Sequence, residues 1–333
     1  MMTDIIFNLD FNTMGDEQYR YAMRAVEESN IRLGVLLQSE NLSIASLDRK
    51  LFPRSVAASR QFVRFLRILL KQRLQATKSA VGSSSPDIFS FLERCRDPNT
   101  GKGLSVAEVS TETATFVVAG SDTTSTTLAA VSHYLTGSSE WYRRVADEIR
   151  STFSSLDEIK LGPQLNSCTN LRACMDESLR LSPPGGSALW REVESGGALI
   201  DGHYIAQGCD VGVGIYSIHH DPRYWANPLE FDPARWLHGD GEGQRKKDAR
   251  QPYMPFSIGP RSCVGKPLAI AQVMLTFARL LWEFDIRRAG SAPSWADGEA
   301  ETVPAEYALK DHVSARKEGP LLCFRPRRIN SNA

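Results

Sequence analysis

Long hydrophobic runs are absent from this chain of 333 residues. No stretch reaches the roughly 18 apolar residues that a membrane-crossing helix requires, and the start, Met1-Met2-Thr3-Asp4, has no signal-peptide pattern. An excess of charge of either sign is also absent, because 39 basic residues balance 39 acidic ones. No overall field would therefore draw the chain to nucleic acid or to an anionic membrane. We expect no nucleic-acid partner and no membrane anchor in this chain.

Paired cysteines are missing as well. The six cysteines form no CxxC motif and no regular framework, which is typical of a reducing, intracellular compartment rather than of a secreted protein. We therefore expect no disulfides. What the composition does contain is 42% hydrophobic residues, enough to bury a substantial core, and no internal repeat is apparent. These properties favour one globular domain over residues 1–333.

The most informative segment is the loop at residues 256–265, Phe-Ser-Ile-Gly-Pro-Arg-Ser-Cys-Val-Gly. Gly259 and Gly265 allow backbone angles that are closed to other residues, so a flat ligand can approach the main chain on either side of Cys263. Pro267 suits a first helical position, and apolar residues recur after it at helical spacing. The pattern therefore predicts that Cys263 lies at a helix N-terminus, where backbone N–H groups favour a thiolate that binds a metal.

This loop closely resembles the haem-binding loop of the haem-thiolate monooxygenases, the cytochrome P-450 superfamily, whose pattern is Phe-x-x-Gly-x-Arg-x-Cys-x-Gly. The resemblance implies that Cys263 is the axial ligand of a haem iron. It also implies that Arg261 pairs with a haem propionate and that Phe256 packs beside the sulfur. A thiolate ligand pushes electron density toward iron and favours O–O cleavage. The alternative, a buried structural cysteine, is the commoner role of a lone cysteine, but the surrounding glycines and arginine argue against it.

A long central helix is predicted at about residues 105–137, beginning at the capping-box sequence Ser105-Val106-Ala107-Glu108. Within it, Gly120 is followed by Asp122 and Thr123. A Thr hydroxyl that bonds back to the preceding turn can distort the helix locally. The resemblance implies that Thr123 holds water or the distal oxygen and that Asp122 relays protons from solvent. A merely capped or solvated pair is the alternative.

Glu177 and Arg180 share one face of a predicted helix that ends before Pro183-Pro184. The same Glu-x-x-Arg spacing occurs at residues 17/20, 93/96, 140/143 and 242/245, so the spacing alone indicates little. Only Glu177 is followed by a Pro-Pro stop, then by the segment 231–236, Phe-Asp-Pro-Ala-Arg-Trp, and then by the cysteine loop. This is the family's order of landmarks. The resemblance therefore implies a buried structural network of Glu177, Arg180 and Arg235.

Three further features are more open. Arg191 matches a second propionate-binding arginine of the family, and an arginine on a surface strand is the alternative. The run His219-His220-Asp221-Pro222 suggests a metal site, but neighbouring side chains on an extended segment point in opposite directions. The family carries a similar turn without a metal, so we expect none here. Basic residues at 245–247 and 250 can dock an acidic face of a reductase or form an ordinary solvated run.

Local signals complete the predicted fold. Residues 1–80 read as helical, and the basic, amphipathic stretch Arg60–Arg73 can touch a membrane surface. We favour the alternative, in which Phe62, Phe65, Ile68 and Leu69 pack on the core. Short strands are predicted at residues 198–200 and 211–215, around Asp201-Gly202, and loops at 82–86 and 237–250. The predicted fold class is mainly α with small β-sheets, a haem-thiolate monooxygenase fold without its N-terminal part.

The resemblance covers residues from about 100 to 328 firmly and implies monooxygenation. One oxygen atom of O₂ would enter a small lipophilic substrate, with electrons from NADPH delivered by a flavoprotein reductase. Specialised (secondary) metabolite biosynthesis is the setting that family habit suggests. Substrate contacts are expected near Phe116, Gly120 and residues 187–189 and 311–312. The expected location is intracellular, at the surface of the endoplasmic reticulum membrane if the chain is like its family and otherwise in the cytoplasm.

One departure from the family pattern bears on activity. The chain begins where the family is already advanced, and the Trp-x-x-x-Arg propionate clamp occurs nowhere in it. We therefore expect the lone chain to hold haem weakly. The alternatives to a monooxygenase are a non-catalytic truncated remnant or short isoform that acts through partner binding, and a haem-thiolate isomerase that uses peroxide substrates. Asp122-Thr123 argues against the isomerase, because isomerisation needs no proton relay.

Overall fold

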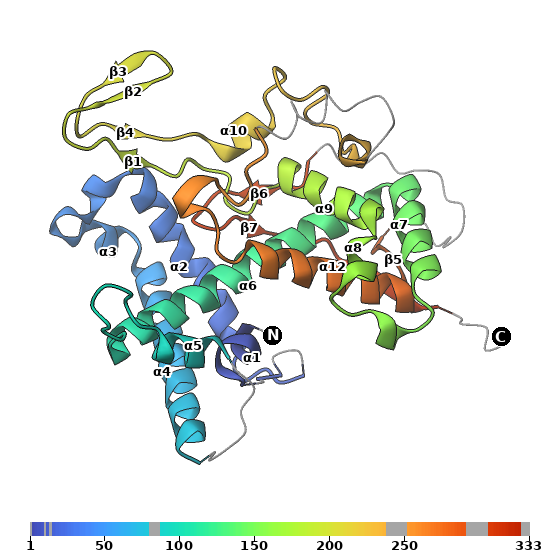
Figure 1. The fold of residues 1–333 in the computed structure, drawn as a ribbon, viewed down its shortest axis with the longest axis horizontal. Helices are drawn as coiled ribbons and strands as arrows, with labels where there is room; N and C mark the ends of the chain where they lie inside the picture. Colours follow the sequence, from blue (N-terminus) through green and yellow to red (C-terminus); the bar gives the residue numbers. More distant parts are fainter. Residues whose placement is uncertain are drawn as a thin grey trace. The chain divides into compact units, whose positions relative to one another are not determined.

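The structure is a computed structural model that describes residues 2–9, 11–12, 15–79, 87–237, 252–290 and 306–327. It is rich in helix with small sheets (Figure 1), which confirms the predicted fold class. The chain divides into two compact units, the first of residues 1–123 and 312–314 and the second of residues 124–311 and 315–333. The single domain over residues 1–333 stays a prediction.

The first unit is helical, as predicted for residues 1–80. Helices α2 and α4 pack along each other (Figure 1), and the basic α4 turns its apolar side inward. Phe62, Phe65 and Leu69 are buried, which confirms core packing for that side. The elements are α1 (Met2–Phe7), α2 (Tyr21–Gln38), η1 (Glu40–Ser46), α3 (Leu47–Leu51), α4 (Pro53–Ser79) and α5 (Ile88–Arg94).

A buried ion pair ties α4 to α5 in this unit. Nε of Arg73 donates to Oδ2 of Asp87 at 2.8 Å, and Asp87 also caps α5 by accepting from the backbone N–H of Ser90 at 2.7 Å. Burial alone would raise the pKa of Asp87, but the hydrogen bonds from Arg73 and Ser90 outweigh it and lower that pKa. The carboxylate therefore stays charged and holds the two helices together.

The predicted long helix is α6 (Val106–Gly137). Its capping box is present, because Ser105 N–H donates to Glu108 Oε2 at 2.7 Å and Glu108 N–H donates to Ser105 Oγ at 3.2 Å. Both N-terminal donors are thereby satisfied, as the sequence predicts. The helix begins in the first unit and continues into the second from Thr124.

The core of the second unit lies among α6, α7, α9 and α12, which Figure 1 shows grouped together. Its helical elements are α7 (Ser139–Thr152), η2 (Leu156–Glu158), α8 (Pro163–Asn166), α9 (Thr169–Leu181), α10 (Ile215–His219), η3 (Pro233–Trp236), η4 (Gly259–Arg261) and α12 (Lys266–Glu283). Each of the four long helices contributes an apolar stripe to this core. The buried residues include Leu135, Val145, Ile149, Leu171, Met175, Phe277 and Leu281.

Every sheet formed by the described residues is two-stranded and antiparallel. The pairs are β1 (Arg191–Glu192) with β4 (Asp210–Val211), β2 (Ala198–Ile200) with β3 (His203–Ile205), β5 (Phe284–Arg288) with β8 (Leu322–Pro326), and β6 (Leu309–Lys310) with β7 (Arg316–Lys317). The strand predicted at residues 198–200 is confirmed. Its partner is reached through Asp201 and Gly202, whose φ angles are +49° and +78°.

The strand predicted at residues 211–215 is present only in part: β4 ends at Val211, Gly214 forms an isolated bridge with Ala188, and α10 begins at Ile215. Two glycines explain the early end, because glycine weakens a strand. Gly212 also lies against the Trp190 ring, where an added Cβ would come within 3.0 Å of a ring carbon. The pairing with the β1 segment is therefore interrupted at this close approach and resumes in the same register at the Ala188–Gly214 bridge.

All six cysteines are free thiols. Within the described ranges, no helix combines the length and the apolar character needed to span a bilayer. The predicted loop at residues 82–86 and residues 238–250 of the second predicted loop lie outside the described residues.

Candidate functional site

The cysteine loop precedes α12 in the second unit. Its ends are tied by the Cys263 amide, which donates to the carbonyl of Phe256 at 2.8 Å. Inside it, the Ser262 amide donates to the Gly259 carbonyl at 3.0 Å and closes the short turn η4. Because α12 begins at Lys266, Cys263 lies just before a helix N-terminus, as predicted.

The two glycines of the loop serve different purposes. Gly259 has a φ of +74°, in the region that favours glycine, which confirms the expected backbone freedom there. Gly265 has a φ of −81° and a ψ of 0°, which other residues adopt readily, so that expectation is wrong for Gly265. Its small size matters instead, because a Cβ at this position would lie 3.7 Å from the Cys263 Sγ. Glycine thus adds no side-chain atom of its own beside the sulfur.

The side chains of the loop fit a flat apolar group that bears acidic substituents and binds a thiolate. Cys263 is an exposed free thiol, and its apolar neighbours Ile258 and Val264 are 69% and 81% exposed. Arg261 is exposed and forms no ion pair with any residue of the described ranges. Phe256 is half-buried against the hydrophobic core of the second unit. A ligand thiol, an apolar surface and a free guanidinium therefore occur within one short loop.

Glu177 and Arg180 of α9 form a fully buried ion pair. Nε and Nη2 of Arg180 donate to the two carboxylate oxygens of Glu177 at 2.9 and 2.8 Å. The other N–H groups of Arg180 donate to the carbonyls of His219, Pro228 and Glu230 at 2.9, 2.7 and 3.1 Å. A buried charge is tolerated only when it is paired and its hydrogen bonds are made, and both conditions hold here.

The same carboxylate also receives donors from η3 and its cap. Nε of Arg235 donates to Oε1 of Glu177 at 3.3 Å, and the Trp236 indole N–H donates to Oε2 at 2.9 Å. The Asp232 backbone N–H adds a bond to Oε1 at 3.0 Å. The structure thus brings together the three residues of the predicted network. That the network serves haem incorporation stays a prediction.

The other Glu-x-x-Arg pairs are different in kind. Arg20 and Glu17 pair at 3.0 Å on the surface, with side chains that are 43% and 85% exposed. Arg96 donates to the backbone carbonyl of Glu93, and Glu140 pairs with Arg144 rather than with the arginine three residues away. Residues 242 and 245 lie outside the described ranges. Of the described candidates, only the α9 pair is buried.

His219 connects this network to the cysteine loop, a role that no sequence pattern indicated. Its carbonyl accepts from Arg180, and its ring Nε2 accepts from the backbone N–H of Met254 at 2.9 Å. The ring stacks on Tyr253 with centroids 5.5 Å apart. Burial lowers the pKa of His219 to about 3, so the ring is neutral and Nε2 is free to accept. Since Nε2 accepts, the proton resides on Nδ1.

Asp122 and Thr123 lie on α6 in the first unit. The Thr123 hydroxyl donates to the Ala119 carbonyl at 2.6 Å, which is the predicted bond to the preceding turn. The predicted local distortion is nevertheless wrong, because α6 is helical without a break. A carbonyl oxygen has two lone pairs, so it can accept from the hydroxyl and from the helix at once.

The carboxylate of Asp122 is held by a neutral amide. Asp122 is 8% exposed and Asn30 of α2 is 3% exposed, and Nδ2 of Asn30 donates to Oδ2 of Asp122 at 3.1 Å. Asp122 is therefore neither a solvated nor a simple capping residue. An amide can serve both protonation states, because its NH₂ donates to a carboxylate and its oxygen accepts from a carboxylic acid.

Two other predicted positions are placed as follows. Gly120 lies against Met2 of α1, whose Sδ would be 2.9 Å from an added Cβ, so α1 approaches α6 closely there. Arg191 is exposed on β1 and donates to the carbonyls of Leu189 and Trp190 at 3.3 and 2.7 Å. Its position therefore agrees with the alternative of an arginine on a surface strand. Propionate binding by Arg191 stays a prediction. The basic run at residues 245–250 lies outside the described residues.

The comparison with known families is decisive. The family model described as Cytochrome P450 matches residues 1–299. The chain belongs to the cytochrome P450 family. Its P450 relatives include a fungal enzyme, cytochrome P450 monooxygenase lcsN of Purpureocillium lilacinum, at 61% identity over 328 residues, covering 98% of this chain and 96% of the relative. Cytochrome P450 monooxygenase poxM of Penicillium oxalicum is 46% identical over 325 residues, covering 98% of this chain and 60% of the relative.

A solved P450 structure shares the fold. The heme domain of cytochrome P450DA superposes with a TM-score of 0.72 at 19% identity, covering 98% of this chain and 65% of that chain. The cofactor of the P450 family is haem with a thiolate-bound iron. Three features fit this group: the free thiol of Cys263, the exposed Ile258 and Val264, and the exposed guanidinium of Arg261, which forms no ion pair with the part of the chain that the structure describes.

We expect Arg180→Leu to lower the free energy of unfolding by about 3–5 kcal/mol, because it leaves the Glu177 carboxylate buried without its main partner. Haem content should fall with it. Arg20→Leu removes the same charge from an exposed pair and should cost no more than about 1 kcal/mol. Chemical denaturation and the haem-to-protein ratio measure both effects. Equal losses in the two variants would show that the α9 pair has no special role.

We expect stability to fall as the pH drops below 6.5, because the unfolded His219 ring then takes up a proton that the folded ring, with its pKa of about 3, refuses. The loss should be about 1.4 kcal/mol per pH unit between pH 6 and pH 4. In His219→Gln the amide oxygen can still accept from Met254 but does not titrate. The difference in unfolding free energy between the parent and His219→Gln should therefore narrow or reverse as the pH falls. If the unfolding free energies of the two proteins ran parallel as a function of pH, the prediction would be wrong.

Proposed function

We propose that this P450 inserts one oxygen atom from O₂ into a small lipophilic substrate in specialised metabolism, with electrons from NADPH delivered by a flavoprotein reductase. The observation that carries the proposal is the exposed Cys263 thiol, held before α12 between exposed apolar side chains and beside an arginine that forms no ion pair with a described residue. The monooxygenase names of relatives at 61% and 46% identity support the reaction class.

On the cysteine side, each residue would have a separate task. Cys263 would ligate the iron, Arg261 would neutralise a propionate, and Ile258 and Val264 would pack on the macrocycle. When bound, thiolate-ligated haem supplies the activation of O₂. The Glu177–Arg180–His219 chain of hydrogen bonds would keep the loop in place by its bond to Met254.

On the α6 side, the residues would move protons, which the reduction of O₂ consumes. Asp122 would carry a proton from solvent, and Asn30 would hold its carboxyl group in one orientation before and after the transfer. Thr123, whose hydroxyl donates to the Ala119 carbonyl, would also contact a water molecule in the relay. That these groups face the haem belongs to the proposal.

Two rival functions make different demands on the same residues. A haem-thiolate isomerase would need Cys263 but no proton relay, and the buried Asn30–Asp122 pair favours the monooxygenase. A non-catalytic protein that acts through partner binding would need neither the Cys263 ligand nor a proton relay. Titrating the purified chain with haem separates this last rival from the two enzymes, because only the enzymes require one haem per protein.

We expect Cys263→Ser to abolish the absorption band of the reduced, carbon-monoxide-bound state that reports a thiolate ligand, because a neutral hydroxyl is a poor donor to iron. Cys209→Ser is the matched control, since Cys209 is also an exposed free thiol. The control should keep the band. A band that survived in Cys263→Ser would assign the iron ligand to another residue.

We expect Thr123→Ala and Asn30→Leu to load as much haem as the parent protein but to lower product formed per NADPH about tenfold or more, with peroxide released instead, since general acid catalysis contributes at least that much. Thr115→Ala is the matched control, because Thr115 makes the same back-bond on the same helix, to Thr111 at 3.0 Å. Product and peroxide per NADPH are the measurements. If Thr123→Ala formed as much product per NADPH as the parent, Thr123 would not belong to the relay. If only Asn30→Leu did so, Asp122 would not depend on the Asn30 amide.

A further inference from the structure

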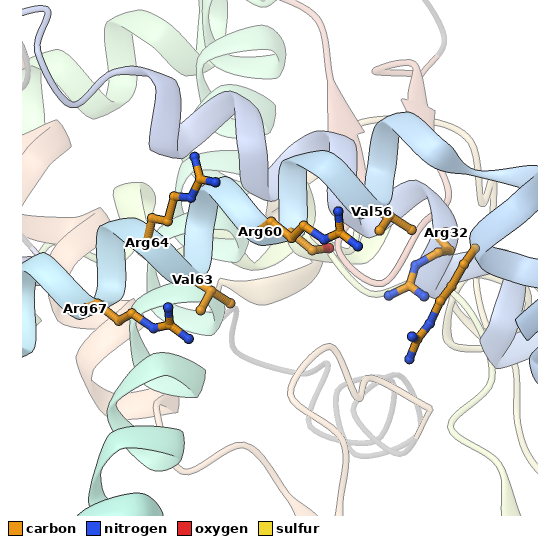
Figure 2. Close-up of a pocket in the computed structure, with 8 residues that line it drawn as sticks. Arg32, Val56, Arg60, Val63, Arg64 and Arg67 are labelled. Carbon is orange, nitrogen blue, oxygen red and sulfur yellow. The ribbon is translucent and has the colours of Figure 1, made fainter.

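An arginine pocket lies on the surface of the first unit, along α4. It has a volume of about 410 Å³, within the range of small-molecule sites. Figure 2 shows Arg60, Arg64 and Arg67 on successive turns of α4, with Arg32 of α2 beside them. The residues that line the pocket are Arg32, Arg49, Val56, Ser59, Arg60, Val63, Arg64 and Arg67.

Four of the five guanidinium groups have no acidic partner among the residues that the structure describes. Arg32 is paired with Asp48 at 2.5 Å, and Asp48 is buried, so this pair is fixed at the edge of the pocket. The other four arginines form no ion pair with any described residue, and three of them come from a helix, residues 53–79, that has seven basic and no acidic residues. In a chain whose charges balance overall, this accumulation of unpaired positive charge is local. The electrostatic free energy of the pocket would fall on binding an anion.

The chemistry of the lining selects the class of anion. A guanidinium is planar and offers paired N–H groups that match a phosphate, and several of them around one hollow match more than one negative charge. Val56 and Val63 add an apolar wall, and Val63 is 44% exposed. An organic phosphate would use both the charge and the wall, whereas an inorganic ion would use the charge alone.

A second hollow extends this surface along α4. It has a volume of about 390 Å³, shares Arg67 with the first, and is otherwise lined by Leu70, Lys71, Leu74 and Gln75. Leu74 is 40% exposed. The apolar part of a phosphate ester can therefore lie over Leu70 and Leu74 while its phosphates contact the arginines.

We propose that the arginine pocket binds a phosphate ester that carries at least two negative charges. This function is separate from oxygen insertion and rests on no part of it. The ligand is either a soluble organic phosphate or the headgroup of an anionic lipid, since the two share this chemistry. Paired N–H groups gathered around one hollow suit a discrete phosphate group.

The test is calorimetric titration of the purified protein with inorganic pyrophosphate, at low ionic strength because salt screens exposed charges. We expect saturable binding that Arg60→Gln/Arg64→Gln/Arg67→Gln weakens at least tenfold. The matched control is Arg24→Gln/Arg54→Gln/Arg143→Gln, which removes three exposed arginines that do not line the pocket. This control should bind pyrophosphate like the parent.

Two further probes identify the source of the phosphate. Binding to phosphatidic acid vesicles in addition to pyrophosphate, lost in the same triple variant, would assign the pocket to a lipid headgroup. Binding to pyrophosphate without the vesicles would assign it to a soluble phosphate. Equal weakening in both triple variants, no binding of pyrophosphate by the parent, or binding of vesicles or polyglutamate alone would overturn the proposal.

Discussion

The buried carboxylate of Glu177 is the group on which the organisation of the second unit depends. It accepts hydrogen bonds from Arg180, Arg235, Trp236 and the backbone of Asp232, so it joins α9 to η3. Arg180 carries the connection onward to the carbonyl of His219, whose ring accepts from Met254 at the start of the cysteine loop. A buried charge of this kind is costly unless every partner is present, and the partners come from α9 itself and from residues 232–236. The position of the loop is therefore coupled to the integrity of a pair far from it in the sequence.

Arginine plays two opposite roles in this protein, and burial decides which. Arg73 and Arg180 are buried, and each is tied to a carboxylate. Arg73 thereby joins α4 to the cap of α5, and Arg180 joins α9 to the carbonyls of residues 219, 228 and 230. Arg60 and Arg261 are exposed and have no acidic partner in the described part of the chain. A guanidinium left unpaired at the surface contributes little to folding, but it is ready to bind an anion. An overall net charge of zero hides this division, because structural and ligand-binding cations are counted alike.

The sequence predicted features that local chemistry determines. The capping box at Ser105, the long helix after it and the turn around Cys263 follow from residues close together in the chain, and the structure has all three. The Glu177–Arg180 pair could be distinguished from the other Glu-x-x-Arg pairs only by the order of sequence motifs along the chain. Asn30 and His219 escaped prediction because their partners lie 92 and 35 residues away, and no spacing pattern marks such contacts. The interruption of the predicted strand at Gly212 has the same cause, since it depends on the close approach of Trp190, which is a tertiary contact.

The bond between His219 and Met254 has an evolutionary consequence. One partner is an imidazole ring nitrogen, whereas the other is a main-chain N–H that every residue except proline possesses. Substitution at position 254 should therefore be tolerated for nearly any side chain of suitable size, with proline the exception. Position 219 should accept only residues that place a neutral acceptor at the same point in a buried site. This single hydrogen bond thus restricts the side chain at position 219 strongly and the side chain at position 254 hardly at all.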